Sequence, residues 1–149
     1  MTDILQLENF QIIKMQVEIV YPQEQLEDEE NTIPEHNFGV DYKVFRKTND
    51  EFRYKMSLVV SIEPRNFGWK VDSQIDGYFL CPKESTIPER EGIIRINGGT
   101  ILYGLLRGQL SAFTGSFPNG PFVLPTINMI DVVKAKEEQE GNIVKDSTE

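Results

Sequence analysis

The spacing of apolar residues changes once along the chain, near residue 97. Before that point apolar residues recur at every second position, and after it they recur at spacings of three and four. The first period is that of a strand with one buried face, and the second is that of a helix with one buried face. The pattern predicts an α+β fold, with a four-stranded antiparallel sheet followed by one long helix, a proline-rich loop and a short C-terminal helix.

Four stretches have the period of two, and each predicts a strand with one apolar face. They cover residues 10–21, 38–47, 52–62 and 69–79. The predicted apolar faces are Ile13, Met15, Val17, Ile19 and Tyr21 in the first strand, Phe38, Val40, Tyr42 and Val44 in the second, Phe52, Tyr54, Met56, Leu58, Val60 and Ile62 in the third, and Trp69, Val71, Ser73, Ile75, Gly77 and Phe79 in the fourth.

The segments between these strands contain typical turn and loop residues. Asn49 and Asp50 predict a hairpin between the second and third strands. The pair Asp76-Gly77 fits either a hairpin turn or a bulge. We favour a bulge inside one strand, because residues 78–81 would make a very short partner strand. Residues 23–37 and 82–92 are charged and predict loops, and the contiguous acidic run EDEE lacks the glycine of a calcium loop.

The long helix is predicted from about Asn97 to Gly115, with Thr100 as its N-cap after two glycines. The Gly98-Gly99-Thr100 turn also has parts of a phosphate cradle. It lacks the lysine and the preceding buried strand that phosphate loops use, so a helix entrance is the better interpretation. The helix face predicted to meet the sheet consists of Ile101, Leu102, Leu105, Leu106, Leu110 and Phe113.

A second stripe of this helix consists of small residues. A glycine inside a helix costs about 1 kcal/mol relative to alanine, so a repeated glycine suggests that another backbone approaches closely. Polar residues interrupt the segment too often for a membrane span, which favours a contact between helices in water. A helix kinked at Gly104 is the alternative. The predicted oligomer interface is Gly104, Gly108, Ser111, Ala112 and Gly115.

The rest of the chain contains a rigid turn, an apolar extended segment and a polar end. Residues 117–121 read FPNGP, and the segment after them is apolar enough to need a cover. A short helix is predicted over 131–136, and residues 137–149 are predicted to be a disordered acidic tail. The predicted organisation is therefore one domain over residues 1–136 followed by that tail.

Charge and cysteine content limit the possible partners and compartments. Fifteen basic and 24 acidic residues give a net charge of −9, which argues against binding to nucleic acid or anionic membrane surfaces. We find neither an apolar stretch of spanning length nor an N-terminal signal, and one cysteine allows no internal disulfide. These features predict a cytoplasmic protein without membrane insertion.

The residues that most often perform chemistry are few and scattered. His36 is the single histidine and lies in the acidic segment, Cys81 follows an apolar run, and Asp72 and Asp76 share a strand face of mixed charge. We interpret them as a solvated histidine, a core thiol and part of an exposed face. We therefore predict no catalytic residue, no metal site, no cofactor and no enzyme activity. The surplus of apolar side chains over what one helix can cover predicts association or an open groove.

The stretch ILYGLLRGQLSAFTGSFP, followed by FVLPTINMIDVV, resembles the SecB family of export chaperones and SecB-like relatives. The resemblance spans about residues 10–136. It is most specific in ILYGLLRGQLSAFTGSFP, and the stretch from there to LPTIN carries the signal, while the strands match only in length and period. It implies a dimer of dimers that holds unfolded clients in hydrophobic grooves, with Gly104 and Gly108 where helices meet. The implied groove residues are Val40, Tyr42, Val44, Phe122, Leu124, Ile127, Met129 and Ile130.

Two departures from the family pattern bear on the partners. SecB binds the ATPase SecA through an acidic sheet face, whereas Lys14, Lys43, Arg53, Lys55 and Lys70 give the presumed outer face here a mixed charge. Gly104 also stands where the family has a helix-start proline. The family pattern makes SecA one expected partner. The mixed charge weighs against export with SecA and favours the other expected partner, a toxin-antitoxin pair, which some SecB-like proteins serve.

The leading hypothesis is an ATP-independent holdase chaperone that binds unfolded or precursor polypeptides. One rival is a hotdog-type thioesterase, which also wraps a sheet around a long helix, but places that helix after its first strand. A second rival is a structural subunit that uses its apolar faces only to form oligomers.

Overall fold

The protein is described by a computed structural model that covers residues 4–22 and 33–147, with the side chains of the last helix described up to residue 140. Four strands come first, β1 (Gln6–Val20), β2 (His36–Arg46), β3 (Arg53–Pro64) and β4 (Gly68–Leu80). They are followed by α1 (Ile87–Ile93), a π-helical turn, η2 (Ile94–Gly98), α2 (Gly99–Phe113) and α3 (Met129–Ser147). The predicted α+β class and its four-stranded antiparallel sheet are confirmed.

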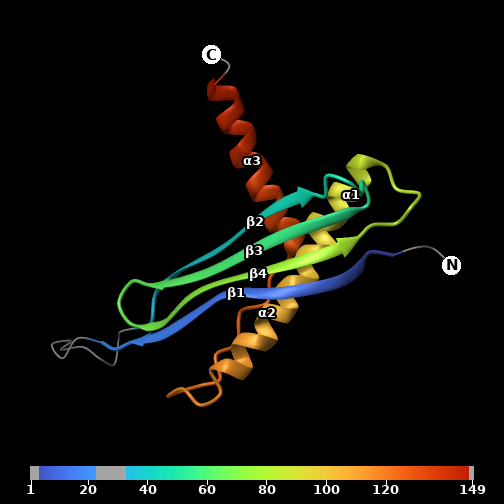
Figure 1. Ribbon diagram of the computed structural model, residues 1–149. Coiled ribbons are helices and arrows are strands. Elements are labelled where there is room, and N and C mark those ends of the chain that lie inside the picture. Colours follow the sequence, from blue (N-terminus) through green and yellow to red (C-terminus); the bar gives the residue numbers. More distant parts are fainter. Residues whose placement is uncertain (1–3, 23–32, 148–149) are drawn as a thin grey trace.

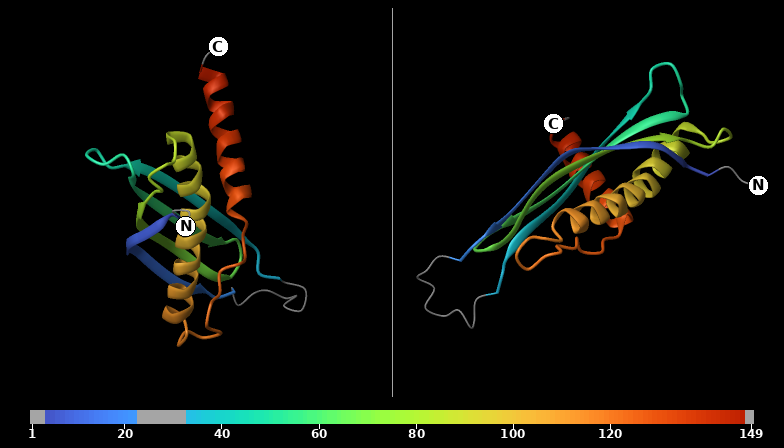
Figure 2. Two further views of the ribbon diagram at one scale, coloured as in Figure 1. Left: turned by 90° about the vertical axis from the view of Figure 1, so that its right-hand side faces the viewer. Right: turned by 60° about the horizontal axis from the view of Figure 1, so that its bottom comes forward.

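The strands form one antiparallel sheet in the order β1-β4-β3-β2. β1 and β2 are consecutive in the chain but lie at opposite edges of the sheet (Figure 1). α2 runs along one face of the sheet, and the described residues place no helix on the opposite face (Figure 2). All four strands precede α2, which is not the hotdog order.

The hydrophobic core lies between the sheet and α2. β3 and β4 contribute the predicted alternating faces, and α2 contributes three leucines with no exposed surface, Leu102, Leu106 and Leu110. A Cβ atom added to Gly77 would lie 2.5 Å from a methyl carbon of Leu102. Glycine at position 77 therefore lets α2 approach β4. β4 is one continuous strand, as predicted, but its pairing with β3 is regular at Asp76 and Gly77.

The bulges of the sheet lie in β1 instead. The register between β1 and β4 shifts between Leu7 and Asn9 and again between Ile12 and Lys14. The second shift reverses the alternation, so that Ile12 packs against the core and Ile13 is 50% exposed. The prediction that Ile13 shares the inner face of Met15 and Val17 is wrong, because a residue inserted by a bulge moves the side chains on one side of it to the other face.

The helix that covers the sheet begins earlier than predicted. Thr86 is the N-cap of α1, and its hydroxyl accepts a hydrogen bond from the amide of Glu89 at 3.4 Å. The chain stays helical from α1 through η2 into α2. The predicted loop over residues 82–92 is therefore partly helix, and Thr100 is not the N-cap: it lies inside the helix, where its hydroxyl donates to the carbonyl oxygen of Ile96 at 2.7 Å.

The two glycines before Thr100 serve packing. A Cβ on Gly98 would lie 3.4 Å from the ring of Phe79, and one on Gly99 would lie 2.6 Å from the methyl carbon of Met129. Both residues are buried within the helix, at the junction of η2 and α2. They bring the helix close to β4 on one side and to α3 on the other.

The C-terminal helix is longer than predicted. α3 runs from Met129 to Ser147, whereas the sequence predicted a helix over 131–136 and a disordered tail over 137–149. The boundary proposed at residue 136 falls inside this helix, and residues 148–149 lie outside the described chain. The far end of α3 projects away from the sheet (Figure 1 and the left panel of Figure 2). Within the described ranges no helix is long and apolar enough to cross a membrane.

Candidate functional site

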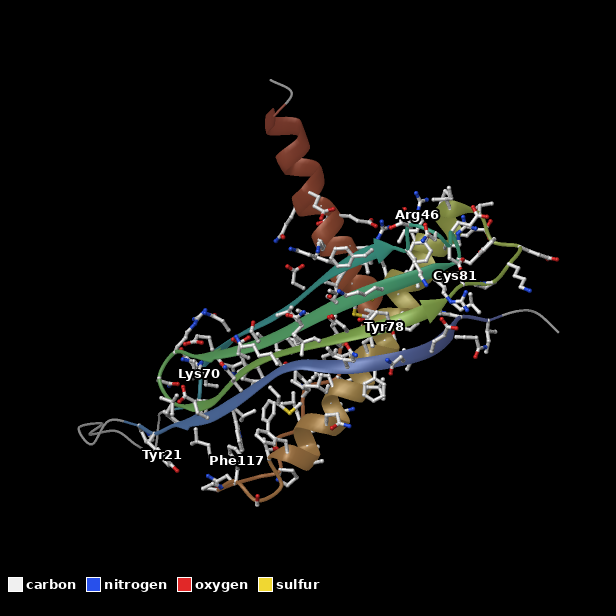
Figure 3. The ribbon with its side chains drawn as sticks, viewed as in Figure 1. Tyr21, Arg46, Lys70, Tyr78, Cys81 and Phe117 are labelled. Atoms are coloured by element: carbon white, nitrogen blue, oxygen red, sulfur yellow. The ribbon has the colours of Figure 1, made fainter. Side chains whose placement is uncertain are left out.

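An apolar groove lies at the end of the sheet where β1 ends and β4 begins. Its volume is about 650 Å³. Figure 3 shows two residues from this end, Tyr21 and Phe117, opposite the end that holds Arg46 and Cys81. The groove is lined by Ile19, Val20, Tyr21, Pro22, Pro34, His36, Ile62, Phe67, Gly68, Trp69, Asn119, Phe122, Val123 and Pro125.

The aromatic side chains at this end form a connected group. The ring of Trp69 on β4 lies 5.3 Å from that of Phe122 and 5.8 Å from that of Phe117, measured between centroids. Phe113, at the end of α2, lies 5.6 Å from Phe117. Tilted ring pairs of this kind stabilise the packing of the loop on the sheet by more than the burial of apolar area alone. Trp69 therefore joins the loop after α2 to the sheet.

The same loop is held to α2 by two side chains. The hydroxyl of Thr114, which is fully buried, donates to the carbonyl oxygen of Leu110 at 2.7 Å and accepts from the amide of Phe122 at 2.8 Å. The hydroxyl of Tyr103 donates to the carbonyl oxygen of Pro125. The loop thus runs back along the helix, and a helical pattern of leucines gave no indication of these two polar anchors.

Residues 122–130 alternate between buried and exposed positions. Leu124 has no exposed surface and Met129 is 3% exposed, so both belong to the core. Their predicted place on an open groove wall is corrected here, because a side chain that fills the interior is not available to a ligand. Phe122 and Ile127 are half-buried, and Val123 and Ile130 are 49% and 43% exposed. The loop after α2 forms one wall of the groove, with Asn119, Phe122, Val123 and Pro125.

The predicted residues of β2 lie elsewhere. Val40 borders a cleft of about 580 Å³ between β2 and α3, together with Val132 and Ala135. Tyr42 and Val44 border a third cleft, of about 360 Å³, beside Arg95 and Lys136. The predicted set is therefore divided among these two clefts, the core and the segment after α2, and of this set only Phe122 lines the apolar groove. The sequence analysis did not identify Tyr21, Trp69, Val123 and Pro125 as groove residues. The position of Trp69 directly after a strand break was the feature of the sequence that could have indicated it.

The small-residue stripe lies on the side of α2 that faces away from the sheet. Gly104, Gly108, Ala112 and Gly115 are exposed, and Ser111 is half-buried. A Cβ on Gly104 or Gly108 would meet no atom within 4 Å among the described residues. Nothing within the described protein explains these two glycines, in contrast to Gly77, Gly98 and Gly99. The prediction that they lie in an interface between subunits stays a prediction.

The candidate chemical groups differ in burial and surroundings. Cys81 is 2% exposed, and burial raises the pKa of its thiol to about 11, which keeps it protonated at neutral pH. His36 is exposed at the start of β2 and borders the groove. Asp76 is buried rather than exposed, and it accepts a hydrogen bond from the hydroxyl of Ser57 at 2.6 Å. Among the described residues no three His, Cys, Asp or Glu side chains form a metal site.

The sheet face without a helix carries paired charges. Lys14 contacts Asp72, Lys70 lies 3.5 Å from Glu18, and Lys55 lies 3.6 Å from Asp76. Figure 3 shows Lys70 on this face. The predicted mixed charge is confirmed. The pairs Lys14–Asp72 and Lys70–Glu18 are exposed on both sides and contribute little to stability, whereas Lys55 pairs with the buried carboxylate of Asp76.

Comparison with solved structures identifies the fold. The SecB-like chaperone Rv1957 of Mycobacterium tuberculosis, solved in complex with a ChAD peptide from the Rv1956 HigA1 antitoxin, is similar over 83% of this chain and 90% of its own, with a TM-score of 0.61 and 12% sequence identity. A protein of unknown function from Streptococcus agalactiae matches over 82% of this chain and 97% of its own, with 15% identity and a TM-score of 0.45. No family model and no curated protein matches the sequence.

Proposed function

We propose that this protein, whose fold is SecB-like, is an ATP-independent holdase chaperone that binds unfolded or precursor polypeptides in the apolar groove. The observation that carries the proposal is a groove of about 650 Å³ lined by aliphatic and aromatic side chains and walled by a loop fastened to α2. An unfolded chain would gain roughly 1.5–3 kcal/mol for each large apolar side chain that it buries there. Contacts of this kind have weak sequence preference, which suits a binder of many sequences.

The client and the partners belong to the same proposal. The mycobacterial chaperone was solved with an antitoxin peptide, so an antitoxin is a candidate client here, and a toxin-antitoxin pair is a candidate partner. Protein export with SecA is the other possibility. The paired charges on the open sheet face leave little net acidic surface for SecA, which favours the antitoxin. The proposed site of action is the cytoplasm.

The test of the chaperone activity is suppression of aggregation. Chemically unfolded luciferase is diluted into buffer with the protein, and light scattering is followed. We expect scattering to be suppressed by the wild type and much less by Val123→Asp, which places a charge on the groove wall. Ile130→Asp is the matched control, because Ile130 is similarly exposed and lies outside the groove. No suppression by the wild type at severalfold excess contradicts the chaperone function.

The proposed assembly is an oligomer, a dimer of dimers, in which the small residues of α2 meet those of another subunit. Gly108→Leu should separate the helices and shift sedimentation toward smaller species. Gly92→Leu is the control, since both glycines are helical and have open space around a Cβ in this chain. An unchanged sedimentation coefficient for Gly108→Leu contradicts this interface. An assembly that leaves luciferase scattering unchanged and exposes little apolar surface to a dye indicates the structural subunit.

A further inference from the structure

A further cleft, of about 660 Å³, lies at the end of the sheet where β2 turns into β3, and we call it the hairpin cleft. Gly77 faces α2, so the side chain of its neighbour Tyr78 points to the sheet face without a helix (Figure 3). Lys55 on β3 stands directly opposite Tyr78, and Phe45 on β2 stands directly opposite Lys55. Residues paired in this way point to the same side of a sheet. The three side chains therefore form one row across the open face.

Two members of this row give the hairpin cleft an aromatic surface. Phe45 is 47% exposed, and Tyr78 is half-buried. Their strands are separated by β3, which places the two residues about 10 Å apart. Nζ of Lys55 lies between them, 5.2 Å from the centroid of the Phe45 ring, at the distance of a cation–π contact. The cleft thus presents two rings and a cation on a face that the core of the protein does not use.

The charge around the hairpin cleft is opposite to that of the protein as a whole. Residues 43–55 contain five of the 15 basic residues of the chain and two of its 24 acidic residues. Glu8 is the single acidic residue among the described residues that line the cleft. The basic residues that line it are Arg46, Lys47, Arg53 and Lys55.

Two of these four cations are already paired within the protein. Nε of Arg53 lies 3.0 Å from the carboxylate of Glu8, and Nζ of Lys55 lies 3.6 Å from that of Asp76. Arg46 and Lys47 are exposed and form no ion pair with any residue that the structure describes. These two side chains are therefore the ones that an incoming anion can neutralise without displacing a carboxylate of the protein.

We propose that the hairpin cleft binds an acidic peptide segment of a partner protein, with an aromatic side chain of that segment against Phe45 and Tyr78 and its carboxylates on Arg46 and Lys47. Aromatic and arginine side chains are the residues that most often dominate binding at protein interfaces. Opposite charge adds specificity and faster association. The partner is thus opposite in charge to one that an acidic sheet face would bind.

The overall charge of the protein favours a short peptide over nucleic acid as the occupant. A nucleic acid strand that extends beyond the cleft would meet the surface of a protein whose net charge is −9. A peptide with a few carboxylates contacts the basic residues alone. No residue lines both the hairpin cleft and the apolar groove, so this inference does not rest on the proposed chaperone function.

Titration of the full-length protein with a peptide, followed by NMR of the backbone amides, tests the site. The probe is a heptapeptide in which one phenylalanine is flanked on each side by three glutamates. We expect saturable shifts within residues 43–55 and 76–80, and weaker binding when sodium chloride is raised from about 50 to about 300 mM, because salt screens exposed charges. The same peptide with lysines in place of glutamates should not bind. Absence of saturable shifts at about 1 mM peptide, or shifts at Trp69 and Phe122 instead, overturns the proposal.

Two pairs of variants separate the cleft from the overall charge and hydrophobicity of the protein. Lys47→Glu should weaken peptide binding about threefold to tenfold, while Lys134→Glu makes the same change at an exposed position outside the cleft and should have little effect. Phe45→Ala should weaken it about threefold to tenfold. Phe113→Ala is its control, because Phe113 is also 47% exposed and lies outside the cleft. Equal losses within either pair contradict the assignment to this cleft.

Two further measurements test the nature of the occupant and the independence of the site. Tighter binding of a single-stranded oligonucleotide of about ten thymidines than of the acidic peptide contradicts the proposal and indicates nucleic acid. Lys47→Glu should suppress luciferase scattering as well as the wild type does, and a parallel loss of suppression contradicts a separate site. Failure of the wild type to suppress scattering, with peptide binding retained, contradicts the chaperone function alone.

Discussion

The loop after α2 and the helix α3 both cover part of the inner face of the sheet, and they are attached to it by different means. The loop is held by buried groups: Leu124 has no exposed surface, and the fully buried hydroxyl of Thr114 bonds to both the helix and the loop. α3 begins with the buried Met129 and Val133, and beyond them its contact with β2 is the ion pair of Lys136 and Asp41, whose side chains are 24% and 69% exposed. Buried apolar and polar contacts are costly to break, while exposed ion pairs are not.

This difference separates a firmly held wall from a helix held by an exposed ion pair. The groove wall needs a constant shape, because a loop that had to be ordered on binding would lower the affinity for every client. Variants of the two regions should therefore differ in their effect on stability, and the comparison fails if they do not.

The largest effect is expected from Leu124→Asp, which places a charge without a partner in the core. The free energy of unfolding should fall by at least about 3 kcal/mol, from lost burial and from the cost of the buried carboxylate. Urea unfolding measures this loss. Val123→Asp changes the exposed neighbour and should remain within about 0.5 kcal/mol of the wild type. A stable Leu124→Asp would mean that the loop is not part of the core.

Thr114→Val should have the next largest effect. Valine fills nearly the same volume, but the amide of Phe122 loses its acceptor and remains half-buried. Such a loss costs about 1–3 kcal/mol. Thr126→Val, on an exposed position of the same loop, is the matched control. If both variants unfold at the same urea concentration as the wild type, the hydroxyl of Thr114 does not fasten the wall.

The smallest effect is expected at the contact of Lys136 with Asp41 and should depend on pH. Burial acts to raise the pKa of Asp41, but the hydrogen bonds from Lys136 and from the Tyr42 amide, with the charges of Lys136 and Lys43, lower it overall from 3.8. Because the pKa is lower in the folded state, this stabilisation is present above 3.8 and is lost as the pH falls through the folded value.

Comparison of the wild type with Asp41→Asn therefore isolates the charge at this position. The wild type should be slightly more stable at neutral pH, and the two unfolding midpoints should converge in acid. The difference should be small, because the carboxylate is largely exposed. A difference that persists in acid would show that Asp41 acts through its shape or its hydrogen bonds and not through its charge.

Much of the fold could be predicted because its strands and helix bury one face each. The inner faces of β3 and β4 follow an undisturbed period of two, and the buried leucines of α2 follow a helical period. β1 was harder to place, since Ile12 and Ile13 are both apolar and either one fits the inner face. The start of the helix was missed because the Thr86-Ile-Pro-Glu89 sequence, a capping pattern, stands among charged residues that also suit a loop.

The candidate site was predicted less completely. The sequence identified residues 122–130 as an apolar segment in need of cover, but a run without period does not say which side chains turn inward. Leu124 and Met129 proved to be core, and Phe122 alone of the predicted groove residues lines the apolar groove. The other groove residues come from segments far apart in the chain, the end of β1, the start of β4 and the loop after α2.

By itself the sequence determined which segments form strands and helix, because burial on one face imposes a period that each segment carries alone. It also marked Gly104 and Gly108 as unusual, and they remain unexplained by contacts within this chain. Only the tertiary structure decided the strand order and the positions of the bulges in β1. It also decided which residues line the groove and that Lys136 contacts Asp41 and Tyr42. Those features depend on contacts between residues distant in sequence, for which no local pattern exists.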